Sequence, residues 1–141
     1  MSVTPTLLFL DIDGVMHPVD APDLRFRPRF ETVMREFPDV QIVIASDWRK
    51  HHTLEELQDL FAADLAARII DVTPLDPTPE YFPGRRQLRV GEWLRQHGRE
   101  HESWAAIDDD VSNYDLGANL VLCDDGFREM EERALRTVLA G

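Results

Sequence analysis

Two carboxylates separated by one residue follow directly on an apolar run near the start of the chain. The run is Leu7–Leu10, and Asp11, Asp13 and Gly14 come after it. Because side chains alternate along a strand, both carboxylates leave it on the same side. Like charges at the end of a buried strand repel each other and lose hydration, which a bound cation would offset. The calcium-loop alternative is weak, because Val15 stands where an EF-hand needs a third oxygen ligand.

Polar residues also follow two later apolar runs. Ser46 and Asp47 come after residues 40–45, and Asp108 and Asp109 come after residues 104–107. Short unbroken apolar runs are typical of strands buried on both faces. If the first strand is central, with the second and fourth as neighbours, these polar residues meet in one crevice beyond the strand ends.

Strand and helix patterns alternate through most of the chain. Apolar runs predict strands at residues 7–10, 40–45, 69–72, 104–107 and 120–123. A 3.6-residue apolar period predicts helices over residues 30–37, 54–65, 86–97 and 130–139, and the prolines of residues 73–84 predict a loop. We therefore expect a single α/β domain over residues 1–141, a doubly wound three-layer sandwich with a mostly parallel five-stranded sheet.

Composition limits the classes of function. The chain has 141 residues and a net charge of -12, which argues against a general nucleic-acid binder. No apolar run approaches the ~20 residues of a membrane span, and no signal peptide is expected. The single cysteine, Cys123, lies in an apolar run, so we expect it in the core of a cytoplasmic protein.

The positive charges are not evenly spread along the sequence. About half of them fall in three clusters: Arg25, Arg27, Arg29, Arg49, Lys50, Arg85, Arg86 and Arg89. A bias towards arginine explains the residue type but not this clustering.

Four motifs, in this order, resemble those of the haloacid dehalogenase-like (HAD) phosphatases. They are a strand ending D-x-D-G-V, a strand ending in serine, a basic residue opening a later helix, and a strand ending in paired aspartates. The segments F-L-D-I-D-G-V, I-A-S-D-W-R and W-A-A-I-D-D-D are similar to small HAD domains of RNA-repair proteins and to the phosphatase domain of polynucleotide kinases. The resemblance covers nearly the whole chain and implies a Rossmann-like HAD fold.

The resemblance implies a role for each matching residue. Asp11 would be the nucleophile that forms an aspartyl-phosphate, and Asp13 would be the general acid and then the general base. Ser46 would hydrogen-bond the transferring phosphoryl group. Asp108 and Asp109 would hold Mg²⁺ together with the Asp11 carboxylate and the Asp13 backbone carbonyl.

The basic position of the third motif is open, because the family most often has lysine there. The only lysine, Lys50, directly follows the second motif and is too early. We favour Arg86, at the start of a predicted helix, since arginine keeps the charge and binds phosphate through two nitrogens. Arg85 is the alternative, and we expect Arg89 to be exposed.

Neighbouring polar residues could extend the site. Asp47 and Arg49 follow the serine of the second motif and would line the rim of the site, where Arg86 and Ser46 would also bind substrate. A solvated loop is an equally good interpretation of Asp47 and Arg49. We interpret His17, beside a proline, as a surface histidine.

The intervals between the motifs leave no room for a separate cap domain. An open site with an arginine rim suits a phosphate on a bulky molecule, such as a nucleotide or a nucleic-acid end. The acidic total charge suits a small metabolite better. The sequence therefore predicts a Mg²⁺-dependent phosphomonoester hydrolase without naming its substrate or its oligomeric state.

Two other functions remain open. One is a non-catalytic module of the same fold that binds phosphate or a metal ion, which only the missing lysine favours. The other is a receiver-like domain, whose phosphate acceptor lies on the third strand. Here only Asp71 could serve as that acceptor.

Overall fold

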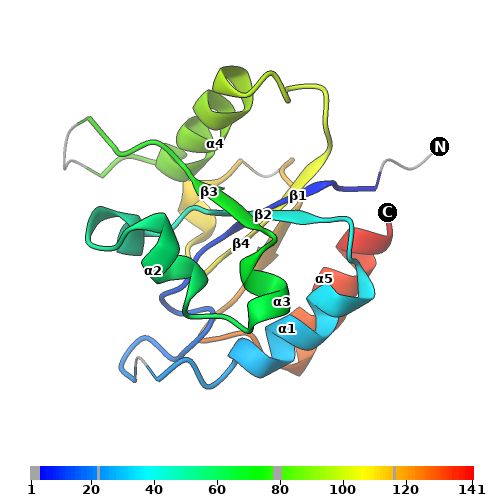
Figure 1. The fold of residues 1–141 in the computed structure, drawn as a ribbon. Helices are drawn as coiled ribbons and strands as arrows, with labels where there is room; N and C mark the ends of the chain where they lie inside the picture. Colours follow the sequence, from blue (N-terminus) through cyan, green and yellow to red (C-terminus); the bar gives the residue numbers. More distant parts are fainter. Residues whose placement is uncertain (1–3, 22, 78–80, 116) are drawn as a thin grey trace.

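The computed structural model describes residues 4–21, 23–77, 81–115 and 117–141 (Figure 1). Its strands are β1 (Leu7–Leu10), β2 (Gln41–Ile44), β3 (Ile69–Val72), β4 (Trp104–Asp108) and β5 (Leu120–Leu122). Its α-helices are α1 (Arg27–Glu36), α2 (Leu54–Gln58), α3 (Ala63–Ala66), α4 (Arg85–Gln96) and α5 (Glu129–Ala140). The 3₁₀ turns η1 (Asp47–Lys50) and η2 (Val111–Asn113) follow β2 and β4. This order confirms the predicted α/β class.

The strands form a parallel sheet in the order β3-β2-β1-β4-β5. β1 lies at its centre, with Leu10 paired to Ile44 of β2 and to Ile107 of β4. The strand order reverses here, because β2 and β3 lie on one side of β1 and β4 and β5 on the other. Open α/β sheets bind ligands beyond the carboxyl ends of the strands at such a reversal. The predicted neighbours of the first strand are thus confirmed.

Two apolar clusters cover the two faces of the sheet. On one face, Leu8 and Leu10 pack with buried side chains of α1, α2, α3 and α5. On the other face, Leu7 and Phe9 pack against α4, where the rings of Phe9 and Trp93 meet edge to face at 5.8 Å. Figure 1 shows α4 on one side of the sheet and α1 and α5 on the other. The predicted three-layer sandwich is confirmed.

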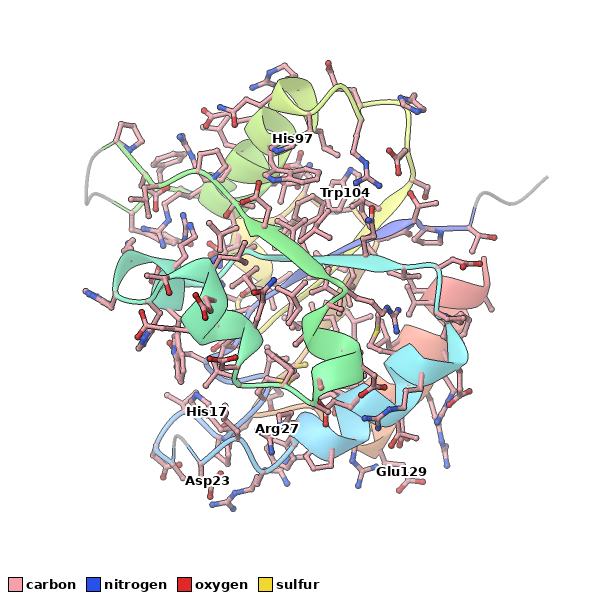
Figure 2. The ribbon with its side chains drawn as sticks, viewed as in Figure 1. His17, Asp23, Arg27, His97, Trp104 and Glu129 are labelled. Atoms are coloured by element: carbon pink, nitrogen blue, oxygen red, sulfur yellow. The ribbon has the colours of Figure 1, made fainter. Side chains whose placement is uncertain are left out.

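The prediction of one helix over residues 54–65 is wrong, because this segment forms two helices, α2 and α3. Between them Ala62 has extended backbone, and its N–H donates to the Glu31 carboxylate at 2.7 Å. Arg27, at the start of α1 (Figure 2), donates from Nη1 to the Leu60 carbonyl at 2.5 Å. Polar side chains of α1 thus bind backbone groups at the break between α2 and α3, and the apolar period of residues 54–65 does not reveal these contacts.

No second sheet or separate helical unit is inserted between the strands in the described ranges. A loop and α1 join β1 to β2, and the segment between β3 and α4 forms neither helix nor strand where it is described. Residues 78–80 of the predicted proline-rich loop lie outside those ranges. No helix of the described part is long and apolar enough to cross a membrane.

Arg68 joins the end of α1 to the start of β2. Its guanidinium donates to the carbonyls of Met34 at 2.7 Å, Phe37 at 2.6 Å and Val40 at 2.8 Å. The last carbonyls of a helix have no partner within the helix, so a cation there satisfies them. This contact fixes where the chain enters β2, the strand that carries Ser46 at its end.

We predict that Arg68→Gln lowers the free energy of unfolding by about 2 kcal/mol, because hydrogen bonds from a charged donor are lost at three partly buried carbonyls. Urea denaturation measures this. Arg133→Gln is the matched control, since the Arg133 side chain is 75% exposed and pairs with Glu129 alone among the described residues. An equal loss in both variants would contradict the structural role of Arg68.

Candidate active site

The ends of the three central strands meet around Asp11. The Asp11 N–H donates to the Ile107 carbonyl at 3.0 Å, and the Ala45 N–H donates to the last residue of β1 at 2.8 Å. These bonds continue the parallel ladder one residue beyond β1. They place Ser46 and Asp108, the next residues of the two neighbouring segments, on either side of Asp11.

Three carboxylates gather at this point. Oxygen atoms of Asp11, Asp108 and Asp109 all lie within 4.8 Å of one another. Asp11 is 1% exposed and Asp108 is fully buried. Gly14, with φ +71°, packs directly against Asp109, and a Cβ at this position would collide with the Asp109 carboxylate. The glycine of the first motif is therefore required both for its backbone conformation and for the room that it leaves.

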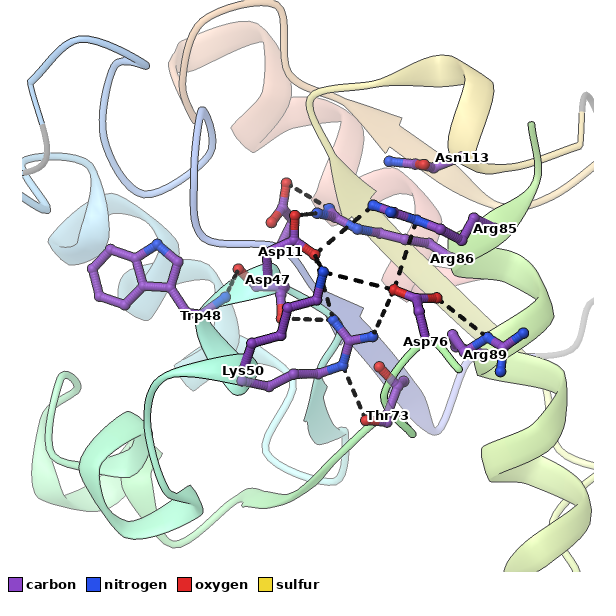
Figure 3. Close-up of polar contacts among 12 residues, drawn as sticks. Asp11, Asp47, Trp48, Lys50, Thr73, Asp76, Arg85, Arg86, Arg89 and Asn113 are labelled. Atoms are coloured by element: carbon purple, nitrogen blue, oxygen red, sulfur yellow. Dashed lines mark hydrogen bonds and ion pairs between the residues drawn. The ribbon is translucent and has the colours of Figure 1, made fainter. Parts of the chain in front are cut away.

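Arg86 bridges two of these carboxylates. Asp11 continues the side of β1 that faces α4, and Arg86 extends from the first turn of α4. Its Nη1 lies 2.9 Å from Asp11 Oδ2 and 2.7 Å from Asp108 Oδ2 (Figure 3). The structure thus places Arg86, rather than Arg85 or Arg89, in contact with Asp11 and Asp108.

Burial controls the ionisation of the two bridged acids. Loss of solvent raises the pKa of Asp11 well above its ordinary value, and the charges of Asp108 and Asp109 raise it further, while Arg86 opposes the shift. Burial also raises the pKa of Asp108, against the effect of Arg86. One guanidinium therefore offsets only part of the cost of ionising this cluster.

The cluster suits a magnesium ion. Mg²⁺ prefers carboxylate oxygens, and three carboxylates offer them here. Asp11 Oδ2 lies 2.9 Å from Arg86 Nη1 but accepts no aligned hydrogen bond within the described residues, so this oxygen can still serve as a metal ligand. The other oxygen of Asp11 is held by the Ile12 N–H at 2.8 Å. A divalent cation would supply the positive charge that Arg86 alone does not.

Asp13 lies apart from this cluster, in the turn that follows β1. Its Oδ1 accepts a hydrogen bond from Trp48 Nε1 at 2.8 Å and lies 3.0 Å from His17 Nε2. The Asp13 side chain is 51% exposed, whereas the His17 side chain is 1% exposed. A buried histidine and an indole therefore orient a carboxylate that faces solvent.

The contacts of His17 orient the Asp13 carboxyl. His17 Nδ1 lies 2.6 Å from the Pro18 carbonyl, which fixes the imidazole ring, and Nε2 lies 3.0 Å from Asp13 Oδ1. The Asp13 carboxyl is therefore held beside a buried imidazole at the boundary with solvent.

The residues in and after the second motif differ in their burial and in their contacts. Ser46 is fully buried, and its Oγ accepts the Trp48 N–H at 3.2 Å. Asp47 is 44% exposed and reaches Lys50 at 3.2 Å. Arg49 is buried and donates to the carbonyl of Ser46 at 2.9 Å and to carbonyls of the segment after β3. Arg49 thus holds the segment after β3 against η1, while the Asp47 side chain remains partly exposed to solvent.

Two expectations from the sequence are wrong. His17 is not a surface residue, because the turn after Asp13 folds it back into the core. Arg89 is buried rather than exposed, with an exposed fraction of 7%, because it packs beside the Asp76 carboxylate. The spacing of His17, four residues after Asp13, was the available signal for the first. The sequence held no comparable signal for Arg89, because its burial depends on contact with Asp76, which lies on a loop distant in the sequence.

Comparison with known proteins gives a family match. Residues 7–131 match the family model described as HAD domain in Swiss Army Knife RNA repair proteins. No curated protein and no solved structure gives a significant match. The matched range includes every residue of the site described above.

We predict that Asp11→Asn stabilises the metal-free protein at about pH 8 by about 1 kcal/mol or more. A raised pKa means that the folded protein binds this proton more tightly than the unfolded chain does. Wild-type stability therefore falls as the pH rises from about 4 through the folded-state pKa, whereas the amide does not titrate. Urea denaturation in chelator at several pH values measures the difference.

Asp64→Asn is the control, because Asp64 is exposed and Arg35 holds its pKa below the ordinary value. Its neutralisation should change stability only slightly, and in the opposite direction. If Asp11→Asn were less stable than wild type at about pH 8, the ion pair with Arg86 would outweigh the cost of burial.

Proposed function

Because the chain belongs to the family of HAD domains found in Swiss Army Knife RNA repair proteins, we propose that it is a Mg²⁺-dependent phosphomonoester hydrolase that acts through Asp11. The observation that carries the proposal is the meeting of three carboxylates with Arg86 where the strand order reverses. Phosphoryl transfer depends on positioning and on charge stabilisation, and this arrangement offers both. We propose that residues 1–141 act as a single domain.

In the first step Asp11 would act as the nucleophile. A carboxylate oxygen of Asp11 forms a bond to phosphorus as the bond between phosphorus and the ester oxygen breaks. Asp13 gives its proton to the leaving oxygen, which becomes a hydroxyl group. His17 and Trp48 hold the Asp13 carboxyl in place for this transfer.

In the second step Asp13 would act as a base. It takes a proton from a water molecule whose oxygen attacks phosphorus, and the bond from phosphorus to Asp11 breaks. Inorganic phosphate leaves, and the Asp11 carboxylate is restored. The exposure of Asp13 suits this step, because water reaches it from solvent.

Positive charge would come from two sources. Arg86 screens Asp11 from Asp108 and would also face the phosphoryl oxygens, while Ser46 would donate a hydrogen bond to them. Asp11, Asp108 and Asp109, with the backbone carbonyl of Asp13, would hold Mg²⁺, which neutralises phosphate charge so that the anionic nucleophile and the substrate can approach each other.

The substrate would be a phosphorylated molecule that needs no cap to bind, such as a nucleotide or a nucleic-acid end. Asp47 and Arg49 would lie at the edge of the substrate site, and the net charge of -12 argues against general nucleic-acid binding. The description of the family, which concerns RNA repair, favours the nucleic-acid end.

A non-catalytic module that binds phosphate or metal is the alternative. Only the replacement of lysine by Arg86 favours it, and Arg86 keeps the positive charge next to Asp11 and Asp108. The receiver-like interpretation loses support, because Asp71 lies on the edge strand β3. There it accepts a hydrogen bond from Trp93 Nε1 at 2.9 Å.

We predict that the purified protein releases phosphate from a generic aryl phosphate only when Mg²⁺ is present, and that Asp11→Asn abolishes this release. Arg86→Gln should lower kcat by about 100-fold or more, and Arg86→Lys should lose less, because it keeps the charge. Steady-state phosphate release with Mg²⁺ and with chelator measures both effects.

Arg95→Gln is the control for charge, because Arg95 lies exposed in the last turn of α4 and away from the acids. It should leave the activity unchanged. Metal-dependent release that persists in Asp11→Asn would contradict the role of Asp11. No release from any phosphomonoester would favour the binding module.

A further inference from the structure

A second cluster of charges lies beside the bridge formed by Arg86. The Asp76 carboxylate, from the segment after β3, is surrounded by Arg49 and Lys50 of η1 and by Arg85 and Arg89 of α4 (Figure 3). We call this arrangement the Asp76 seat. The Asp76 side chain is 4% exposed, and those of Arg49, Arg85 and Arg89 are 2%, 10% and 8% exposed.

The Asp76 carboxylate fits this seat loosely. Its Oδ2 lies 3.6 Å from Arg49, 3.9 Å from Lys50 and 3.8 Å from Arg85, and its Oδ1 lies 3.5 Å from Arg89. A hydrogen bond from a cation to a carboxylate is normally about 2.7–2.9 Å long. Asp76 Oδ1 accepts no hydrogen bond from any described residue. The four cations thus surround Asp76 without a short hydrogen bond to it.

Arg85 is the least satisfied of these cations. Its Nε is buried, and its guanidinium donates no hydrogen bond within the described residues. It lies 3.8 Å from Asp76 and 3.8 Å from Asp47 and packs over the Tyr81 ring at 5.6 Å. A buried donor without an acceptor destabilises a fold, and a ligand with acceptor oxygens would satisfy it.

The seat is continuous with the proposed catalytic site. Arg85 and Arg86 are consecutive residues of α4, and both approach Asp47, at 3.8 Å and 3.9 Å. Arg86 reaches on to Asp11. A ligand in the seat and a phosphoryl group at Asp11 would therefore lie on the two sides of Asp47.

We infer that the Asp76 seat binds a second phosphate group of the substrate, in the place that the Asp76 carboxylate fills here. The inference rests on the proposed function, because it assigns this phosphate to the molecule whose ester Asp11 attacks. A phosphate has more acceptor oxygens than a carboxylate and is larger, so it can reach arginine donors that Asp76 leaves unpaired. A nucleic-acid end and a small bisphosphate share this chemistry.

The test is a binding titration in the Asp11→Asn background, which prevents turnover. Isothermal calorimetry in Mg²⁺ buffer compares adenosine 3′,5′-bisphosphate with the two adenosine monophosphates. We expect the bisphosphate to bind at least about tenfold more tightly than either monophosphate. Adding Arg85→Gln should remove most of this preference, and adding Asp76→Asn should tighten bisphosphate binding, because a competing anion is lost.

Arg95→Gln on the same background is the matched control and should keep the preference. Equal binding of bisphosphate and monophosphates by Asp11→Asn would overturn the inference, as would weaker bisphosphate binding by Asp76→Asn. If Asp76→Asn does not fold, Arg85→Gln decides the question, because the Arg85 side chain makes no hydrogen bond in the described ranges that folding would lose.

The two proposals fail separately. A wild-type protein without phosphatase activity, whose Asp11→Asn variant still prefers the bisphosphate, would overturn the proposed hydrolase and support the seat. An active wild-type protein whose Asp11→Asn variant shows no preference for the bisphosphate would overturn only the inference about the Asp76 seat. A 5′- or 3′-phosphorylated oligonucleotide is the further arm. Tighter binding of the oligonucleotide supports the seat with a nucleic-acid source, and tighter binding of the bisphosphate supports it with a small-molecule source.

Discussion

Three carboxylates converge where the strand order of the sheet reverses, and two of them, Asp11 and Asp108, are almost completely buried. Their mutual repulsion and lost hydration work against folding, and the chain offsets this with the single guanidinium of Arg86. The raised pKa of Asp11 shows that the offset is incomplete. A cation bound beside these carboxylates would offset the rest of this cost.

The rest of the site follows from this constraint. The sheet supplies the convergence, because parallel strands end at one edge. The helix α4 supplies Arg86, and Gly14 leaves room for Asp109. Asp13 stays outside the buried cluster, where His17 and Trp48 hold it at the solvent boundary. A buried carboxylate, Asp11, and a solvent-facing carboxylate, Asp13, thus lie within one short turn.

The sequence predicted the parts of this structure that depend on local pattern. Short apolar runs located the strands, and polar residues at their ends located Asp11 and Asp108. The partnership of Asp13 with His17 and that of Asp76 with four cations were not predicted, because each joins side chains whose contact depends on loop conformation. The break between α2 and α3 was missed for a similar reason, since Glu31 of α1 accepts a hydrogen bond from the backbone there.

In the proposed mechanism Asp11 forms a bond to phosphorus. Acid quenching of the wild-type protein during turnover with Mg²⁺ and a phosphomonoester, followed by peptide mass spectrometry, tests this step. We expect an acyl-phosphate on the peptide that contains Asp11, and none in Asp11→Asn. Phosphate on a different aspartate, such as Asp71, or turnover without any phosphorylated peptide, would contradict it.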